Sequence, residues 1–246
     1  SGPEGVKDLI NGYLMKNEGV LAKEFDLTSY LQWIYKPGEM KIVGLAGRAG
    51  AGKTTRANGL EIIGQDMGIP VVRLGLDVFF KMSSRDRKAW LGEEGVSDEE
   101  MRERENQDNW WDLERAKWAL GVLKSGQRLL MEGVYNRHDK GELTGTVDII
   151  PDLQRGLIII FEGVGVSHLA DEMDDLIFIA AHPNERRARL LGRDGDRRGG
   201  DAAKNRFRIT QKYDAGHFAA HGGKVKRVLE NSGVDLVEVP PAFPFV

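Results

Sequence analysis

Cysteine is absent from the 246-residue sequence. The chain therefore forms no disulfide, and it has neither a thiolate nucleophile nor a cysteine ligand for a metal. No apolar run approaches the roughly 20 residues that a membrane-spanning helix needs, and no signal-peptide pattern opens the sequence. A formal net charge of only −3 gives no overall attraction to nucleic acid or to an anionic membrane. We therefore expect a cytoplasmic protein with no membrane partner, and nucleic acid is a weak candidate for a partner.

Glycine, in contrast, is abundant, with 31 residues, and several glycines fall in one short motif. Residues 47–54 fit the pattern G-x-x-x-x-G-K-[ST] of a phosphate-binding loop. An apolar run at 42–46 predicts a buried strand before the motif, and a helix-compatible stretch at 54–67 follows it. Strand, loop and helix is the order that this motif requires. The residues expected to contact the nucleotide are Gly47, Arg48, Ala49, Gly50, Ala51, Gly52, Lys53, Thr54 and Thr55.

The residue types of the loop explain its chemistry. Glycines allow positive φ, which turns backbone N–H groups toward the phosphates. Lys53 is expected to reach the β- and γ-phosphates, and the Thr54 hydroxyl to bind Mg²⁺. The helix that starts near Gly52 directs its positive end at the anion.

The rest of the chain alternates apolar runs with helical patterns. Strands are expected at 69–76, 156–161, 175–181 and 234–239, and a β-hairpin at 128–150. Strands that alternate with helices indicate an α/β fold, here a three-layer α/β/α P-loop NTPase with a mostly parallel central sheet.

Two parts lie around this fold. Residues 1–39 are expected to form a helical N-terminal extension, with helices near 6–14 and 27–35, and residues 40–246 the P-loop domain. Two further helices are expected at 201–213 and 217–229. A covering layer beside the sheet is the preferred role of the extension, ahead of a cover for substrate or partner.

Two acidic residues end expected strands. Asp77 follows the run 69–76, and Glu162 ends 156–161, the most apolar run, which should be a central strand. Ligands of open α/β folds bind at the carboxyl ends of the strands. We therefore expect Glu162 to hold Mg²⁺ together with Thr54, and Asp77 to face the ligand.

Arginines are concentrated between residues 186 and 198, before Gly199 and Gly200. Arg189, Arg193 and Arg198 in this context indicate a phosphate clamp on a movable lid, at about residues 193–203. A solvated, basic helix end is the alternative.

Two other features have plain interpretations. The strongly charged segment 81–107 is taken as a solvated face, with a mobile flap as the alternative. His217 and His221 are four residues apart, a spacing that can bridge a metal, but neither an intervening acid nor a cysteine accompanies them. A structural role for the two histidines is therefore preferred.

Taken together, the motifs resemble the phosphoribulokinase/uridine kinase family of P-loop kinases. Besides the phosphate-binding loop, the similarity extends over a strand that ends in Asp-x-Phe-Phe, an Asn-x-Asp segment, a hairpin with Val-Tyr-Asn, an apolar strand that ends in Glu-Gly, and the arginine-rich lid. In order, these segments are 74–80, 106–108, 133–138, 158–163 and 186–201. The resemblance covers about residues 40–213.

The resemblance implies an ATP- and Mg²⁺-dependent kinase that phosphorylates a hydroxyl group of a small molecule, most simply a nucleoside. Asp77 would accept or orient the hydroxyl proton, and Lys53 and the lid arginines would stabilise the transferred group. Acceptor contacts are expected from Asp77, Asp108, Tyr135, Arg137 and His138.

The acceptor side departs from uridine kinases, because Asn109 and Trp110 replace the family's His-Pro, and Asn136 and Arg137 replace Asp-Phe. Other acceptors therefore stay open: a sugar, a vitamin precursor, an antibiotic, or a modified base within DNA. A regulatory NTPase without a small acceptor is the rival from another class. The sequence also leaves open whether copies of the chain associate.

Overall fold

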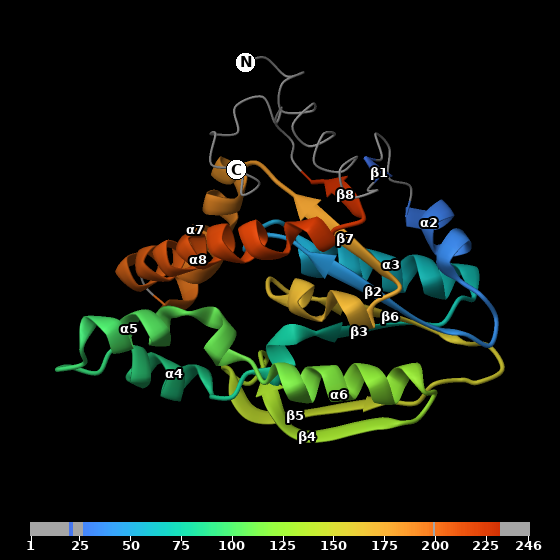
Figure 1. Cartoon of the computed structure of the whole chain (residues 1–246), viewed down its shortest axis with the longest axis horizontal. Coiled ribbons are helices and arrows are strands. Elements are labelled where there is room, and N and C mark those ends of the chain that lie inside the picture. Colours follow the sequence, from blue (N-terminus) through green and yellow to red (C-terminus); the bar gives the residue numbers. More distant parts are fainter. Residues whose placement is uncertain (1–19, 22–26, 199, 232–246) are drawn as a thin grey trace, which may run out of the picture.

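The computed structural model describes residues 20–21, 27–198 and 200–231. Its centre is a parallel sheet of six strands in the order β1-β8-β7-β2-β6-β3 (Figure 1). These strands are β1 (Val20–Leu21), β2 (Met40–Ala46), β3 (Val71–Gly75), β6 (Leu157–Glu162), β7 (Asp175–Ala180) and β8 (Arg227–Glu230). β4 (Leu129–Asn136) and β5 (Glu142–Ile149) form a separate antiparallel hairpin. The expected mostly parallel α/β fold is therefore confirmed.

Both faces of the sheet are covered, which explains why its strands are apolar throughout. Successive residues of a strand point to opposite faces. In β6, Ile159 and Phe161 therefore belong to one core cluster and Ile158 and Ile160 to the other. The second cluster is closed by α2 (Leu27–Ile34) and α3 (Lys53–Met67).

The first cluster is covered by α6 (Leu113–Lys124), the 3₁₀ segment η3 (Val166–Glu172) and part of α8 (Gly200–His221). β6 pairs with β2 on one side and β3 on the other, so it is an interior strand, as its composition predicts. These two covering layers and the sheet complete the α/β/α arrangement (Figure 1).

The charged segment after Asp77 is more ordered than its composition suggests. It contains α4 (Ser84–Leu91) and α5 (Asp98–Glu105), and it is flanked by η1 (Leu76–Phe79) and η2 (Gln107–Trp110). Ser97 caps α5 by accepting a hydrogen bond from the Glu100 N–H. Arg87 and Arg104 are buried here, so the interpretation of this segment as a solvated face is wrong for both.

The C-terminal helices differ from their expected bounds. α7 (Pro183–Arg198) begins at a proline, which the first turn of a helix tolerates, and α8 runs continuously to His221. The helix expected at 217–229 is wrong beyond that point: η4 (Gly222–Lys224) ends it, and Val228 and Leu229 pair with β7 instead. Paired glycines stop the helix, and β-branched neighbours favour the strand.

Two expectations lie outside the described residues, namely the helix near 6–14 and the strand at 234–239. Within the described ranges, every helix is too short or too polar to cross a bilayer.

Candidate active site

The loop between β2 and α3 has the backbone that its glycines predict. Gly47, Gly50 and Gly52 have φ values of 148°, 79° and 94°, which side chains rarely adopt. Space is also limiting, because a Cβ on Gly47 would lie 2.6 Å from the Ile179 carbonyl oxygen and one on Gly50 2.7 Å from that of Arg186. The chain folds tightly here because these positions are glycine.

Lys53 begins α3 and turns back over the loop. Its Nζ donates hydrogen bonds to the carbonyl oxygens of Gly47, at 2.9 Å, and Arg48, at 3.1 Å. The ammonium group is thus held at the centre of the loop, where a phosphate group would meet it.

Thr54 and Glu162 meet at the end of β6, as the sequence predicts. The Thr54 hydroxyl donates to Glu162 Oε1 at 3.0 Å, and Arg73 Nη1 lies 3.7 Å from the same oxygen. Burial raises the pKa of Glu162, and nearby Lys53 opposes this rise. Hydroxyl and carboxylate oxygens are the ligands that Mg²⁺ prefers, so this pair fits the expected ion.

One pocket joins the loop to η1, the β4–β5 hairpin and α8. From the predicted set, Ala49, Gly50, Lys53, Thr54, Asp77, Tyr135, Arg137 and Glu162 line it. The sequence did not point to the other lining side chains that carry charge, a polar group or a ring: Phe80, Arg87, Gln107, Trp111, Arg206, Phe207 and Thr210.

Asp77 lies exposed in η1, directly beyond the carboxyl end of β3. β3 and β6 are neighbours in register, with Gly75 opposite Glu162. The two carboxylates are close enough that the Asp77 charge helps to raise the pKa of Glu162. The pocket therefore has two neighbouring acids in its lining, together with Lys53.

Aromatic rings support the far wall of the pocket. Phe80 stacks on Trp111, with ring centroids 5.7 Å apart, and meets the Tyr135 ring edge-on at 4.9 Å. The Arg87 guanidinium lies 3.9 Å from the centre of the Phe80 ring. A cation over an aromatic face is favourable, so this arginine is held at the wall.

Asp108 and His138 do not line this pocket. His138 is exposed in the hairpin loop, where its N–H donates to the Asn136 side chain. Asp108 lines a second pocket and is bound by His168 and Tyr213. The expectation that both residues contact the acceptor came from the family resemblance of segments 106–108 and 133–138.

A buried charge network behind the loop was not predicted. Asp214 of α8 is fully buried, and its carboxylate accepts the Ala49 N–H at 3.0 Å. Arg186, also buried, lies 3.8 Å from the same carboxylate oxygen. Burial raises the pKa of Asp214 to about 6, although Lys53, the Ala49 N–H and the two arginines Arg186 and Arg48 oppose the rise. No local pattern reveals this contact, which joins residues 165 positions apart.

The predicted lid arginines lie on α7. Arg189 Nη1 donates to the Gly50 carbonyl oxygen at 3.3 Å, and its Nη2 to that of Asn231 at 3.2 Å and to Glu185 at 2.6 Å. It therefore supports the loop from outside the pocket. The backbones of Arg193 and Arg198 belong to α7, while their side chains lie outside the described part of the structure.

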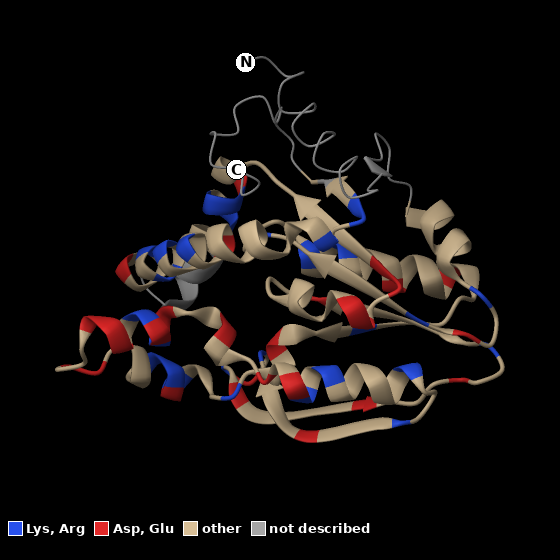
Figure 2. Ribbon diagram, in the orientation of Figure 1, with Lys and Arg blue, Asp and Glu red and all other residues tan. Residues whose placement is uncertain are grey.

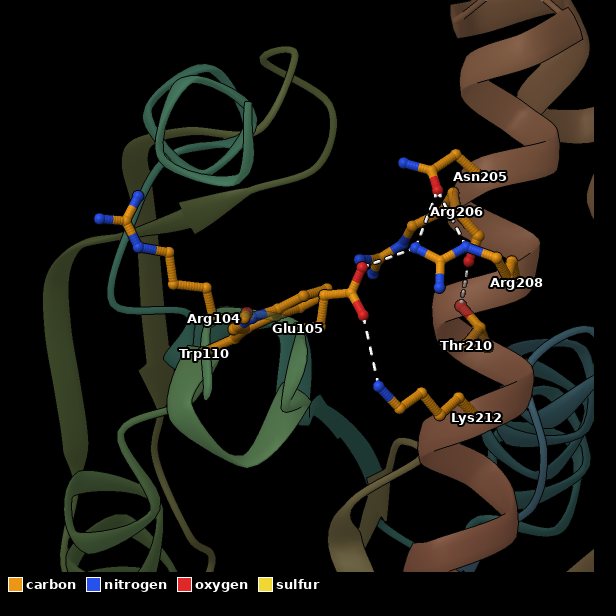
Figure 3. A network of polar contacts seen from close by, with 8 residues as sticks. All are labelled: Arg104, Glu105, Trp110, Asn205, Arg206, Arg208, Thr210 and Lys212. Atoms are coloured by element: carbon orange, nitrogen blue, oxygen red, sulfur yellow. Dashed lines mark hydrogen bonds and ion pairs between the residues drawn. The ribbon is translucent and has the colours of Figure 1, made fainter. Parts of the chain in front are cut away.

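Charged side chains join the helices on either side of the pocket. Lys and Arg are concentrated on α7 and α8, and α5 opposite them carries Asp and Glu (Figure 2). Glu105 accepts a hydrogen bond from Arg208 Nη2 at 2.6 Å and lies 3.5 Å from Lys212 Nζ (Figure 3). Beside them, the Arg206 guanidinium lies 4.3 Å from the centre of the Trp110 ring. α8 is thus held to the segment that ends in η2.

Comparison with known proteins agrees with this geometry. The family model described as the Phosphoribulokinase / Uridine kinase family matches residues 42–218. No curated protein sequence matches the chain.

Several solved structures have a similar fold. Phosphoribulokinase from Rhodobacter spheroides has a TM-score of 0.59 at 16% identity, over 84% of this chain and 74% of its own. D-glycerate 3-kinase from Cryptococcus neoformans has a TM-score of 0.55 at 12% identity, over 89% and 93%. A possible uridine kinase from Bacillus stearothermophilus has a TM-score of 0.54 at 18% identity, over 83% and 97%. At these identities the likeness concerns the fold.

Proposed function

Because the chain belongs to the phosphoribulokinase/uridine kinase family, we propose that it is a kinase that transfers the γ-phosphoryl group of ATP to a hydroxyl group of a small molecule. The observation that carries this proposal is the single pocket that joins the phosphate-binding loop to Asp77. Phosphoryl transfer needs a phosphate cradle and a group that positions the attacking oxygen, and the two lie at one cavity here.

The phosphate side is formed by the loop. Its backbone N–H groups and the Lys53 ammonium bind the phosphate oxygens and hold the γ-phosphorus in place. Thr54 and Glu162 supply oxygen ligands for Mg²⁺, which neutralises phosphate charge when it is bound. Because Lys53 already bonds to Gly47 and Arg48, it is positioned before the nucleotide arrives.

Asp77 acts on the acceptor. Its carboxylate accepts the proton of the attacking hydroxyl, or orients that hydroxyl for in-line attack, which requires only hydrogen-bond reach. Arg193 and Arg198 of α7 belong to the lid that would close over the transferred group and exclude water, while Arg189 holds the phosphate-binding loop from outside the pocket. Water exclusion matters because water would otherwise compete with the acceptor for the phosphoryl group.

A nucleoside is the first acceptor to test, in keeping with the family and with Tyr135 in the pocket wall. A second candidate is an anionic alcohol, such as a sugar phosphate or a hydroxy acid. Three arginines, Arg87, Arg137 and Arg206, line the pocket, and arginine binds phosphate and carboxylate groups in a bidentate manner.

The experiment is an acceptor panel with ATP and Mg²⁺, read by mass spectrometry for the gain of one phosphoryl group. The panel holds uridine, cytidine, neutral sugars, sugar monophosphates and small hydroxy acids. We expect one class to gain the group, and the Lys53→Met variant, assayed in parallel, to transfer none. ATP consumption without acceptor should be a small fraction of the rate with it. Slow ATP hydrolysis that no acceptor accelerates would instead support a regulatory NTPase.

A further inference from the structure

Three histidines from two distant segments meet beside the second pocket. His168 belongs to η3, and His217 and His221 belong to α8. Their candidate ligand nitrogens all lie within 4.8 Å of one another. Each ring also contacts the other two, with centroid separations of 4.4, 4.7 and 4.8 Å. A mutual contact of three imidazoles is an arrangement that metal sites use.

The helix provides two of these ligands and the segment after β6 provides the third. Residues four apart lie on the same face of a helix, one turn from each other, so His217 and His221 point the same way. His168 reaches them because η3 packs on the core through Val166 and Leu169, both buried. The sequence spacing shows only the helical pair, since the third histidine is 49 positions before His217.

A chain of hydrogen bonds fixes which ring nitrogens carry protons. The Tyr213 hydroxyl donates to Asp108 Oδ1 at 2.8 Å, so its oxygen accepts the proton of His217 Nδ1 at 3.2 Å. Asp108 Oδ1 also accepts from His168 Nε2 at 2.7 Å. The lone pairs of His217 Nε2 and His168 Nδ1 are then left for another partner. A carboxylate behind a histidine is the usual outer partner of a metal ligand.

One of these nitrogens has no partner among the described residues. His217 is only 5% exposed, and its Nε2 is buried without a hydrogen bond there. A buried polar atom without a partner costs about 1–3 kcal/mol, so such atoms usually have a ligand.

We propose that His168, His217 and His221 bind one divalent transition-metal ion, with Zn²⁺ as the best match. Three imidazoles suit Zn²⁺, whereas Mg²⁺ and Ca²⁺ prefer oxygen ligands. Nitrogens bound to one Zn²⁺ at about 2.0–2.1 Å lie roughly 3.3 Å apart in tetrahedral geometry. The rings therefore draw inward by about an ångström on binding, which the half-buried His221 allows.

This site is separate from the catalytic pocket. The pocket contacts α8 at Ala203, Arg206, Phe207 and Thr210. The first metal ligand on α8, His217, is seven residues after Thr210, about 10 Å along the helix axis. The ion would join the carboxyl-terminal half of α8 to the segment that follows Glu162. It would therefore fix one end of the helix whose other end lies at the pocket.

The test uses the full chain without a histidine tag, stripped with EDTA and desalted. Zn²⁺ binding is measured by calorimetry and by metal analysis after a second desalting, in excess Mg²⁺. We expect one Zn²⁺ per chain, and an affinity at least 100-fold lower in His168→Gln and in His221→Gln. His138→Gln, which changes an exposed histidine outside the cluster, should bind as the wild type does. Tyr213→Phe breaks the hydrogen-bond chain and should cost about 10- to 100-fold.

Co²⁺ supplies an independent readout, because tetrahedral nitrogen ligation gives visible absorption bands. These bands should appear in the wild type and be lost in His221→Gln, with circular dichroism showing that the variant is folded. If the His168→Gln/His221→Gln double variant, checked in the same way, retains the stoichiometry and affinity of the wild type, the proposal is wrong. Displacement of Zn²⁺ by Mg²⁺ and ATP would also overturn it, since the ion would then lie in the catalytic pocket.

Discussion

Asp77 is the residue on which the proposed chemistry most depends. It lines the same pocket as Lys53, and it is exposed rather than engaged in the core. Asp77→Asn should therefore fold normally and bind ATP with near wild-type affinity. The amide cannot accept the hydroxyl proton, so turnover should fall by about 10²- to 10⁴-fold. Steady-state kinetics with the acceptor and calorimetry with nucleotide measure the two effects. Near-normal turnover would remove Asp77 from the mechanism.

Asp214 gives a second residue-scale prediction, on stability. Burial raises its pKa to about 6, above the ordinary 3.8, so the folded state holds this proton more tightly than the unfolded state. The stabilisation by the bound proton is fully present below pH 4 and is lost as the pH rises through 6. Asp214→Asn keeps the neutral form at every pH. Its unfolding free energy relative to wild type should therefore improve by roughly 2 kcal/mol between pH 4 and pH 7.

The matched control for that measurement is Asp201→Asn, on the same helix. The Asp201 side chain is fully exposed, and its only described ion pair is with Lys204. Unfolding free energies from chemical denaturation, plotted against pH, should run parallel for Asp201→Asn and wild type. If the Asp214→Asn curve is parallel to wild type as well, the carboxylate does not hold the extra proton.

For single residues, local sequence patterns predicted contacts between residues that are close in sequence or that end neighbouring strands. The loop glycines, Lys53, Thr54 and Glu162 meet because strand, turn and helix follow one another, and because parallel strands end together. Asp214 could not be found, since nothing near it in sequence marks a helix residue that turns toward a loop 165 positions earlier. Asp108 shows the opposite error, because its short motif indicated an acceptor contact but its carboxylate bonds to Tyr213 and His168.

Helical glycines test how the elements pack. A Cβ on Gly64 of α3 would collide with Val71 Cγ2 and lie 3.0 Å from the Ile69 carbonyl oxygen. Gly64→Ala should therefore destabilise the fold by about 1–3 kcal/mol. Gly121 of α6 has open space around its Cβ position. Gly121→Ala should instead stabilise by about 0.5–1 kcal/mol, the helix propensity of alanine over glycine. Thermal and urea denaturation of the two variants measures the change in unfolding free energy that each substitution causes. Equal changes in the two variants would contradict this account of the packing.

Helix ends that are marked by a glycine or a proline are the boundaries that a sequence predicts best. Gly126, at φ 75°, follows the end of α6, and Pro183 opens α7, the positions that glycine and proline favour at helix ends. The boundary between α8 and β8 was missed because the apolar residues after Gly222 continue a helical spacing. Tertiary pairing with β7 decides their conformation, and propensity alone does not contain that information.

At the scale of the whole molecule, the burial of α8 suggests how the pocket opens and closes. From Gly200 to Arg208 only Ala203 is buried, whereas the stretch from Ile209 onward buries a side chain at each turn. Salt bridges from Glu105 to Arg208 and Lys212 mark the boundary between these halves. We therefore expect the amino-terminal half to open with the arginine-rich end of α7, while the carboxyl-terminal half stays on the core.

Hydrogen exchange can test this division in the intact protein. Without ligand, amides of residues 200–208 should exchange quickly and those of 209–218 slowly, because local opening is easiest where few side chains are buried. A non-hydrolysable ATP analogue with Mg²⁺ should slow exchange in the first group several-fold, as the arginines close on the phosphates, and leave the second group unchanged. Slowing of both groups by the same factor would mean that α8 moves as one rigid body. The lid would then include the whole helix, and closure would have to separate α8 from the core around Phe218.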